Sequence, residues 1–264
     1  MTTDPSQVAR TAESRAGSES APAATVSIII PTVNEAELVA DQIGRCLALT
    51  PTPEVIVADA GSQDGTPNLA EAAGARLVAC PQRGRALQMN AGAAAAQGSV
   101  LLFLHADVML PQMAFSAMQT ALSDTAIVGG AFRRRFDDPS RLLAFGCRLA
   151  DWRGKVFGLF FGDQSIFVRR ETFRRIGGFP EILLFEDLAL SRLLGRAGRT
   201  CLVRETIIAS GRRFRSEGSL RRLARNGCLT CLYVVGVDPR RLAHRYYPQY
   251  FSLPQSAEKL GRRS

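Results

Sequence analysis

The sequence predicts an α/β protein with a mostly parallel central sheet flanked by helices. Strand-like runs alternate with helical patterns through the first half of the chain, and a strand, helix, strand order produces parallel pairing with right-handed crossovers. The strand-like runs, such as "VSIII" and "VIVAD", are continuously apolar, which is typical of strands covered on both faces. With 264 residues, 46% of them hydrophobic and 22% charged, the chain can bury one substantial core.

The predicted elements follow one another at short intervals. In the first half we expect strands at residues 26–30, 55–59, 76–79 and 100–105. Helical patterns lie near residues 36–48, 67–73, 84–96 and 111–121. In the second half we expect strands at residues 127–136 and 164–170, and a helix at 188–198 that ends at Gly198. Asn34 and Glu37 have the spacing of residues that cap the first helix.

Acidic residues follow three of the predicted strands. Glu35 follows the first strand, Asp59 and Asp64 lie in "ADAGSQDGT" after the second, and Asp107 lies in "LHAD" after the fourth. In parallel sheets, ligands bind beyond the carboxyl ends of the strands. We therefore expect these acidic groups to converge on one edge of the sheet.

The segment "DAGSQDGT" has two interpretations. Its glycines allow a ligand to approach the backbone closely, and Asp59 and Asp64 could accept hydrogen bonds from a base or a ribose. A structural turn with capping residues explains the same composition almost as well. The segment lacks the G-x-S-x-G order of a nucleophile elbow. The chain has neither a Walker A loop nor G-x-G-x-x-G, which argues against phosphate-loop hydrolysis and a dinucleotide cofactor.

Asp107 and His105 interrupt an otherwise apolar run, "LLFLHADVML". A buried carboxylate without a partner is costly, so Asp107 needs a partner, a proton or a metal. If the strand continues, the two side chains lie on the same face. Mg²⁺ is usually held by one or two carboxylates together with substrate phosphates and water. The alternative is that Asp107 caps a helix that begins near Pro111.

The positive charge of the chain lies at its end. Residues 212–264 hold 12 Lys or Arg and 3 Asp or Glu, whereas residues 1–211 hold 21 of each class. A basic segment suits a membrane surface, phosphorylated ligands or nucleic acid, or is a solvated surface. The sequence favours nucleic acid least, because "RRLARNGC" lacks the interleaved aromatics of a single-strand binder.

Cysteines and apolar runs suggest a cytoplasmic protein. The six cysteines are scattered and follow no secretory signal, so we expect them to be reduced. Cys228 and Cys231 form a lone C-x-x-C, for which core packing is favoured over a metal or redox site. The sequence contains no run of 18 apolar residues, so we expect no membrane span. Residues 223–237 could form a core helix or an interfacial helix.

With these pieces in order, the chain resembles the family-2 glycosyltransferases of the GT-A fold, the nucleotide-diphospho-sugar transferase fold. Five stretches carry the resemblance: "SIIIPTVNEA", "VIVADAGSQDGT", "GRALQMNAGAAAAQGSVLLFLHADVMLP", "GDQSIFVRRETFRRIGGFPE" and "FEDLALSRLLGRAG". The segments "GRALQMNAGA", "LHAD" and "SGRRF" are similar to a bacterial subgroup labelled arsenosugar-biosynthesis or radical-SAM/selenodomain-associated transferases. The implied organisation is a disordered segment at residues 1–24, a GT-A domain at 25–215, and a basic helix and tail at 216–264.

The resemblance implies a donor site at the ends of the first strands. Pro31, Thr32 and Glu35 would line the nucleotide pocket, and Asp59 would receive the base. Either Arg83 or Arg85 would reach the nucleotide or its diphosphate.

The family's D-x-D element corresponds to His105-Ala106-Asp107. The resemblance makes Asp107 the carboxylate for Mg²⁺ or Mn²⁺, whereas neutral imidazole favours softer metals, so His105 is expected to donate to ribose or phosphate. In "GRRF", Arg212 and Arg213 match a basic element near the diphosphate and the acceptor.

The catalytic element of the family corresponds to "FEDLALS". Asp187 would be the general base, with Glu186 as the weaker candidate; the alternative is that either residue only caps the following helix. In "GDQSIF", Asp163 and Gln164 match the acceptor side.

The implied reaction is transfer of a sugar from a nucleotide-sugar donor, with a UDP-sugar favoured, to a hydroxyl of a small-molecule or lipid-linked acceptor. The expected displacement is metal-dependent and inverts the anomeric carbon. Two alternatives are a sugar-phosphate nucleotidyltransferase and a non-catalytic protein that uses its basic end on nucleic acid or anionic membrane. The C-terminal segment either contacts the inner face of the membrane or closes the acceptor pocket.

Overall fold

A computed structural model describes residues 25–246 of the chain. Residues 1–24, predicted to be disordered, lie outside the described residues, as do residues 247–264 of the predicted basic tail. None of the described helices is both long enough and apolar enough to cross a bilayer.

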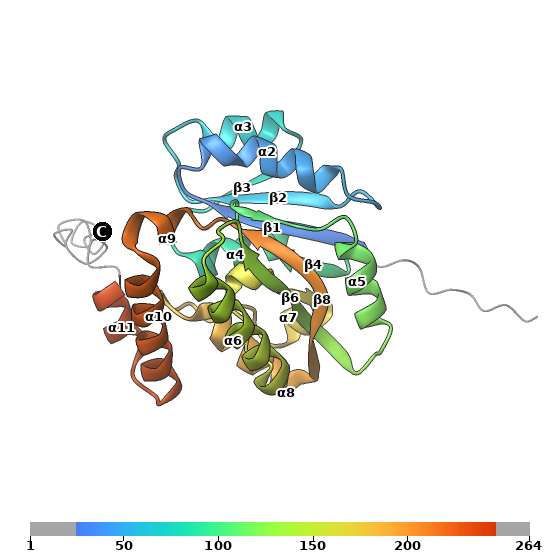
Figure 1. Cartoon of the computed structure of the whole chain (residues 1–264). Coiled ribbons are helices and arrows are strands. Elements are labelled where there is room, and N and C mark those ends of the chain that lie inside the picture. The colour runs from blue at the N-terminus through green and yellow to red at the C-terminus, as the bar shows by residue number, and fades with distance from the viewer. Residues whose placement is uncertain (1–24, 247–264) are drawn as a thin grey trace, which may run out of the picture.

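The described strands form one sheet in the order β3-β2-β1-β4-β7-β6-β8-β5 (Figure 1). Their bounds are β1 Val26–Thr32, β2 Glu54–Asp59, β3 Arg76–Ala79, β4 Val100–Phe103, β5 Val108–Met109, β6 Ile127–Phe136, β7 Phe167–Arg169 and β8 Arg199–Ala209. The pairs β3-β2, β2-β1, β1-β4 and β6-β8 are parallel. Antiparallel pairing occurs where β7 joins β4 and β6, and where β5 joins β8. The predicted mostly parallel sheet is confirmed.

Helices cover both faces of the sheet (Figure 1). The helices are α2 Ala36–Leu47, α3 Thr66–Ala72, α4 Arg85–Ala95, α5 Ala114–Leu122, α6 Arg141–Phe157, α7 Arg170–Arg175, α8 Glu186–Ala197, α9 Arg212–Glu217, α10 Ser219–Val234 and α11 Pro239–Tyr246. Ile28 and Ile30 of β1 pack in one core with α2 and α5, whereas Ile29 packs in a second core with α4 and α8. All three side chains are fully buried, which explains the continuously apolar strand.

The second half of the chain differs most from the prediction. The sequence analysis did not identify α6, α7 or β8. The predicted strand at residues 164–170 is shortened to β7, because residues 162–164 form a 3₁₀ turn. β8 is stabilised by its long parallel pairing with β6. Local periodicity does not predict this strand, because its partner is distant in sequence.

The first helix begins differently from the predicted cap. Asn34 adopts a φ of 54°, and its side-chain oxygen accepts from Gln63 N at 2.9 Å instead of capping α2. The backbone N–H of Ala36 donates to Asp64 Oδ2 at 3.0 Å, and that of Glu35 donates to Thr66 Oγ1 at 2.9 Å. The loop after β2 therefore caps the helix that follows β1.

Cys228 and Cys231 correct another expectation. Both lie on α10, as predicted for an apolar helix, but both are exposed, so the core-packing interpretation is wrong. The buried positions of this helix are Arg222, Leu229 and Tyr233 instead. All six cysteines are free.

Gly130 provides a test of the packing between β6 and β8. A Cβ at this position would lie 2.2 Å from the backbone oxygen of Cys201, which cannot rotate away. We expect Gly130→Ala to lower the free energy of unfolding by about 3 kcal/mol or more, measured by urea denaturation. Gly195→Ala in α8 is the control, because no atom outside the neighbouring backbone of its own helix lies within 4 Å of its Cβ position. This substitution should raise stability by about 0.5–1 kcal/mol. Equal effects of the two substitutions would contradict this packing.

Candidate functional site

Asp59 links the ends of β1 and β2. It lies opposite Thr32 in the parallel register and is 4% exposed. Its Oδ1 accepts from Thr32 Oγ1 at 2.8 Å and from Ser62 Oγ at 2.5 Å, and its Oδ2 accepts from Ser62 N at 2.9 Å. Pro31 precedes Thr32 and is half-buried. These hydrogen bonds explain how the buried carboxylate is stabilised without a cation.

Three of the predicted donor residues line one pocket at this edge. Glu35, Asp64 and Arg212 surround a volume of about 270 Å³ together with Asn34, Ala36, Glu37 and Leu38. This lies just below the roughly 300–1,000 Å³ of typical ligand sites. Thr66 Oγ1 also donates to Asp64 Oδ1 at 2.5 Å, and these hydrogen bonds hold the pKa of Asp64 below its usual value. Asp64 therefore fixes the pocket wall by joining the two loops.

Gln88 is a site residue that the sequence analysis missed. This buried side chain of α4 donates from Nε2 to Thr32 O at 2.8 Å and to Ala58 O at 2.9 Å. It thereby ties α4 to the ends of both strands. The signal was present in the sequence, because Gln88 falls between Ala86 and Met89 on the buried face of the predicted helix.

Asp107 lies in a turn and not on a continued strand. β4 ends at Phe103, and Val108 N donates to His105 O at 3.2 Å across the turn. The Asp107 carboxylate is half-buried and makes no hydrogen bond or ion pair with the other described residues. The helix near Pro111 begins at Ala114 and has no side-chain cap, so the capping alternative for Asp107 is wrong.

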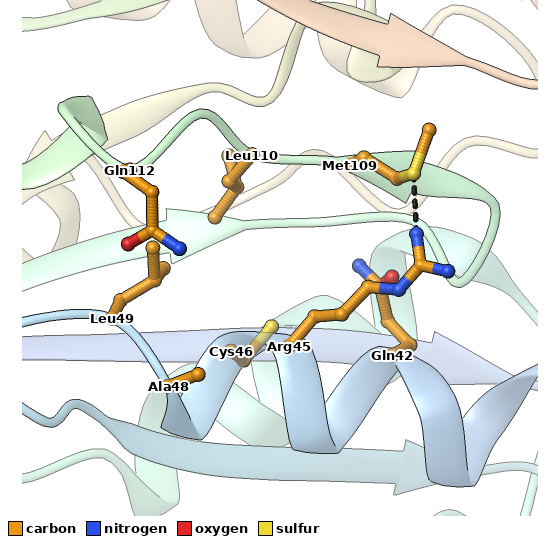
Figure 2. Close-up of a pocket in the computed structure, with 8 residues that line it drawn as sticks. All are labelled: Gln42, Arg45, Cys46, Ala48, Leu49, Met109, Leu110 and Gln112. Atoms are coloured by element: carbon orange, nitrogen blue, oxygen red, sulfur yellow. Dashed lines mark hydrogen bonds between the residues drawn. The ribbon is translucent and has the colours of Figure 1, made fainter.

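The Asp107 turn is held between α2 and β8. Gln42 Nε2 donates to Val108 O at 2.7 Å, and Figure 2 shows Gln42 and Arg45 of α2 directed toward the segment that follows the turn. Between α2 and this segment lies a pocket of about 210 Å³ that is lined by no carboxylate. On the other side, Ser210 N donates to Asp107 O at 3.0 Å. The turn is therefore next to the "SGRRF" segment that supplies Arg212.

Asp187 and Glu186 form the first turn of α8 and are both buried. Asp187 Oδ2 accepts from Gly162 N at 2.7 Å, and its Oδ1 accepts from Leu188 N at 2.7 Å. Glu186 Oε1 is 3.2 Å from Arg85 Nη1 of α4. Phe185 before them has a φ of 67°, an uncommon conformation for a residue with a side chain. Asp187 therefore accepts from a backbone N–H of the first turn of α8, as a capping residue does, and also holds the loop at Gly162.

Asp187 has the electrostatics of a proton acceptor near neutral pH. Burial, followed by the charge of the adjacent Glu186, raises the pKa of Asp187 to about 7. The hydrogen bond from Gly162 N and the charge of Arg85 act in the opposite direction. Since a general base works best with a pKa near the working pH, this carboxylate is suited to accept a proton.

His105 lies on the same side of Gly162 as Asp187. A Cβ at Gly162 would lie 2.9 Å from His105 Nε2 and 3.5 Å from Asp187 Oδ2. The absence of a side chain at this glycine therefore keeps space open between the imidazole and the carboxylate. The fold brings "LHAD" and "FEDLALS" together here.

Asp163 and Gln164 have different surroundings. Asp163 is half-buried and forms an ion pair with the buried Arg134. Gln164 is fully buried, and its Oε1 accepts from Arg153 Nη2 at 3.0 Å and from Phe161 N at 3.1 Å. Because its side chain is enclosed, Gln164 supports the loop and does not face an acceptor.

The predicted donor arginines Arg83, Arg85 and Arg213 differ in what the structure describes of them. Arg83 is exposed and has no hydrogen bond or ion pair with the other described residues, whereas Arg85 contacts Glu186. Of these two alternatives, the geometry favours Arg85. Arg213 lies on α9, but its side chain is outside the described part of the structure.

Comparison with known proteins identifies the family. The sequence matches the glycosyl transferase family 2 model over residues 27–169, more than half of the chain. The chain belongs to glycosyltransferase family 2. The match covers the sheet edge with Asp59 and Asp107 and ends before α8. It supports transfer of a sugar from a nucleotide sugar, while the narrower bacterial subgroup stays a prediction.

Solved glycosyltransferases share the fold of this transferase. Mannosyltransferase PcManGT from Pyrobaculum calidifontis, in complex with GDP-Man and Mn²⁺, aligns with a TM-score of 0.63 at 20% identity, over 85% of this chain and 69% of that chain. Glucosyl-3-phosphoglycerate synthase from Mycobacterium tuberculosis, in complex with Mg²⁺ and UDP, aligns with a TM-score of 0.59 at 21% identity, over 81% and 80%. At this identity the likeness shows the fold, which confirms the predicted GT-A class. Among curated proteins, none matches the sequence.

The residues at the edge fit a cation that is shared with a substrate. Within residues 25–246, no group of three or more His, Cys, Asp or Glu side chains could hold a metal ion by itself. The transferase instead offers the single carboxylate of Asp107, which has no protein partner among the described residues. Such a donor set suits Mg²⁺ or Mn²⁺ when substrate phosphates and water complete the coordination.

The pKa of Asp187 gives a test that does not depend on any substrate. Glu186→Gln removes the negative charge that helps to raise the Asp187 pKa, so this pKa should fall below about 7. It should stay above the usual value because burial remains. Carboxyl ¹³C NMR titration measures the shift, and Glu181→Gln at an exposed position is the control. An unchanged Asp187 pKa in the Glu186 variant would show that the two carboxylates are not coupled.

Proposed function

We propose that this transferase moves a sugar from a nucleotide-diphosphate sugar to an acceptor hydroxyl in one inverting step that depends on a divalent cation. The observation that carries the proposal is the buried Asp187 carboxylate, with a pKa of about 7, which lies on the same side of Gly162 as His105. Family membership supports the reaction class. A buried carboxylate with this pKa would suit the proton transfer that the proposed reaction requires.

The donor would bind over the ends of β1 and β2. Pro31, Thr32 and Asp59 would face the base, and Glu35 and Arg212 would line the adjoining pocket. A UDP-sugar is the favoured donor. The named complexes contain GDP-Man in one neighbour and UDP in the other, so the base is part of what the experiment has to decide.

The acceptor would bind on the side of α8. Tyr233 of α10 stacks on Phe185 with ring centroids 4.8 Å apart. Phe185 directly precedes the two candidate catalytic residues in the sequence. This contact supports the alternative in which the C-terminal helix closes the acceptor pocket. We keep residues 25–215 as the catalytic domain and 216–264 as the basic segment, although this boundary falls inside α9.

In the proposed mechanism, Asp187 takes the proton of the acceptor hydroxyl as that oxygen attacks the anomeric carbon. The attack and the departure of the nucleoside diphosphate occur on opposite faces of the sugar, so the configuration inverts. Arg85 and Arg212 would stabilise the negative charge of the leaving group, and His105 would donate to ribose or phosphate. Asp107 would hold the divalent cation, which when bound neutralises charge on the diphosphate.

Asp187→Asn tests the general base. The amide cannot accept the proton, so turnover should fall at least about a hundredfold. Donor affinity, measured by calorimetry, should change little because Asp187 is on the acceptor side. Asp41→Asn on the exposed side of α2 serves as the control and should keep full turnover. Unchanged turnover in the Asp187 variant would remove this residue from the mechanism.

Asp107→Ala tests the cation site. Thermal-shift screening with UDP-, GDP- and dTDP-sugars should find one donor that raises the melting temperature, because a ligand specific for the folded state stabilises it. The shift should require Mn²⁺ or Mg²⁺ and should disappear in the Asp107 variant. Asp124→Ala, which breaks a surface ion pair with Arg199, is the control. A metal-dependent shift that survives in Asp107→Ala would overturn the assignment.

A further inference from the structure

Helix α6 has two apolar faces. One face is buried against the protein through Leu143, Cys147, Ala150 and Gly154. The other carries six large hydrophobic side chains that are 37–64% exposed: Leu142, Phe145, Leu149, Trp152, Val156 and Phe157. We call these six residues the α6 stripe. A contiguous apolar surface of this kind marks an interaction site on a folded protein.

The spacing shows that the stripe is continuous along the helix. Phe145, Leu149, Trp152 and Val156 follow one another at intervals of four, three and four residues, which places them on one side of an α-helix. The rings of Trp152 and Phe157 also pack edge to face, with centroids 5.5 Å apart. The exposed apolar side chains therefore form one surface.

A row of positive charge borders the stripe. Arg141, Arg148 and Lys155 are exposed and recur every seven residues, so they lie along one line of the helix. Asp151, the sole acidic residue of α6, is buried and paired with Arg135. On this helix, the exposed charged side chains next to the stripe are all positive.

The neighbouring helix α10 also exposes apolar and basic side chains. It packs on α6 where Leu223 lies against Gly146, and the two helices lie side by side in Figure 1. Leu220 and Val234 are exposed on α10, as are Arg221 and Arg225. No Asp or Glu occurs in its sequence. The acids just before α6, Asp137 and Asp138, are both paired with Arg215.

We propose that the α6 stripe docks the protein on an anionic lipid bilayer. Exposed Trp, Phe and Leu beside Lys and Arg are the pattern of helices that lie in the membrane interface, and Trp is enriched at that depth. The cationic row matches a negatively charged headgroup layer. A symmetric contact with a second copy would instead bring two cationic rows to one seam without an exposed acid on either α6.

This docking would place the proposed acceptor side near the bilayer. α6 ends at Phe157, and the chain then reaches Gly162, which contacts Asp187. Arg153 of α6 also bonds to Leu159 O at 3.0 Å and to Gln164. Docking itself does not require sugar transfer, so Asp187→Asn should bind vesicles as the wild type does.

The experiment is flotation of the full chain with vesicles of phosphatidylcholine alone or mixed with phosphatidylglycerol. The wild type should float with the anionic vesicles, and binding should weaken as salt is added. Leu149→Gln combined with Trp152→Gln should reduce partitioning at least about tenfold, because bound apolar area is lost. Leu69→Gln on α3 is the control for an exposed apolar side chain.

A second variant separates charge from apolar contact. Arg148→Gln combined with Lys155→Gln should reduce binding to the anionic vesicles about 30-fold, since each basic residue contributes about 1 kcal/mol at such a surface. Arg174→Gln combined with Arg175→Gln, exposed on α7, is the matched control and should change binding little. Unchanged melting temperatures verify that each variant is folded.

Three results would overturn the proposal. The first is that the full wild-type chain does not float with anionic vesicles at low salt. The second is that both α6 variants float as the wild type does. The third is a wild-type dimer that the α6 variants dissociate, with no vesicle binding, which would identify a second copy as the occupant of the stripe.

Discussion

The parallel pairing of β1 between β2 and β4 is the constraint on which the site depends. This register sets Thr32 beside Asp59 and Ile29 beside Phe103, so all three strands end at the same edge. Polar residues that follow these strands are therefore brought together although they are far apart in sequence. Gln88 reinforces the edge by bonding to the last carbonyl groups of β1 and β2. Asp64 extends it by joining the two loops.

Two adjacent buried carboxylates lie on the proposed acceptor side. Asp187 and Glu186 lie next to each other in the protein interior, and Arg85 balances one of the two negative charges. In the nearby loop, Arg134 pairs with Asp163, and Arg153 donates to Gln164. Burial lowers the pKa of Arg153 to about 10. A partly exposed ion pair contributes little net stability. These two contacts are better explained by their positioning of the loop whose Gly162 N–H donates to Asp187.

The C-terminal helices connect the site to the surface of the molecule. Phe185, Leu188, Leu229, Tyr233 and Leu242 form one small core, so α10 and α11 are packed on the start of α8. α6 lies against the other side of α10 and exposes its second apolar face. A helix that is apolar on two sides needs two partners. The protein core is one partner, and a lipid surface is the proposal for the other.

The sequence by itself determined the central architecture. The runs at residues 76–79 and 127–136 match β3 and β6, because apolar periodicity and the turns that interrupt it are local properties. The sequence also predicted that Asp59 ends one strand and that Asp107 follows another. Only the tertiary structure decided that Gln164 is enclosed, that Cys228 and Cys231 face outward and that β8 exists beside β6. Exposure, strand pairing and the Asp187 pKa depend on groups that are distant along the chain and adjacent in space, so no local pattern encodes them.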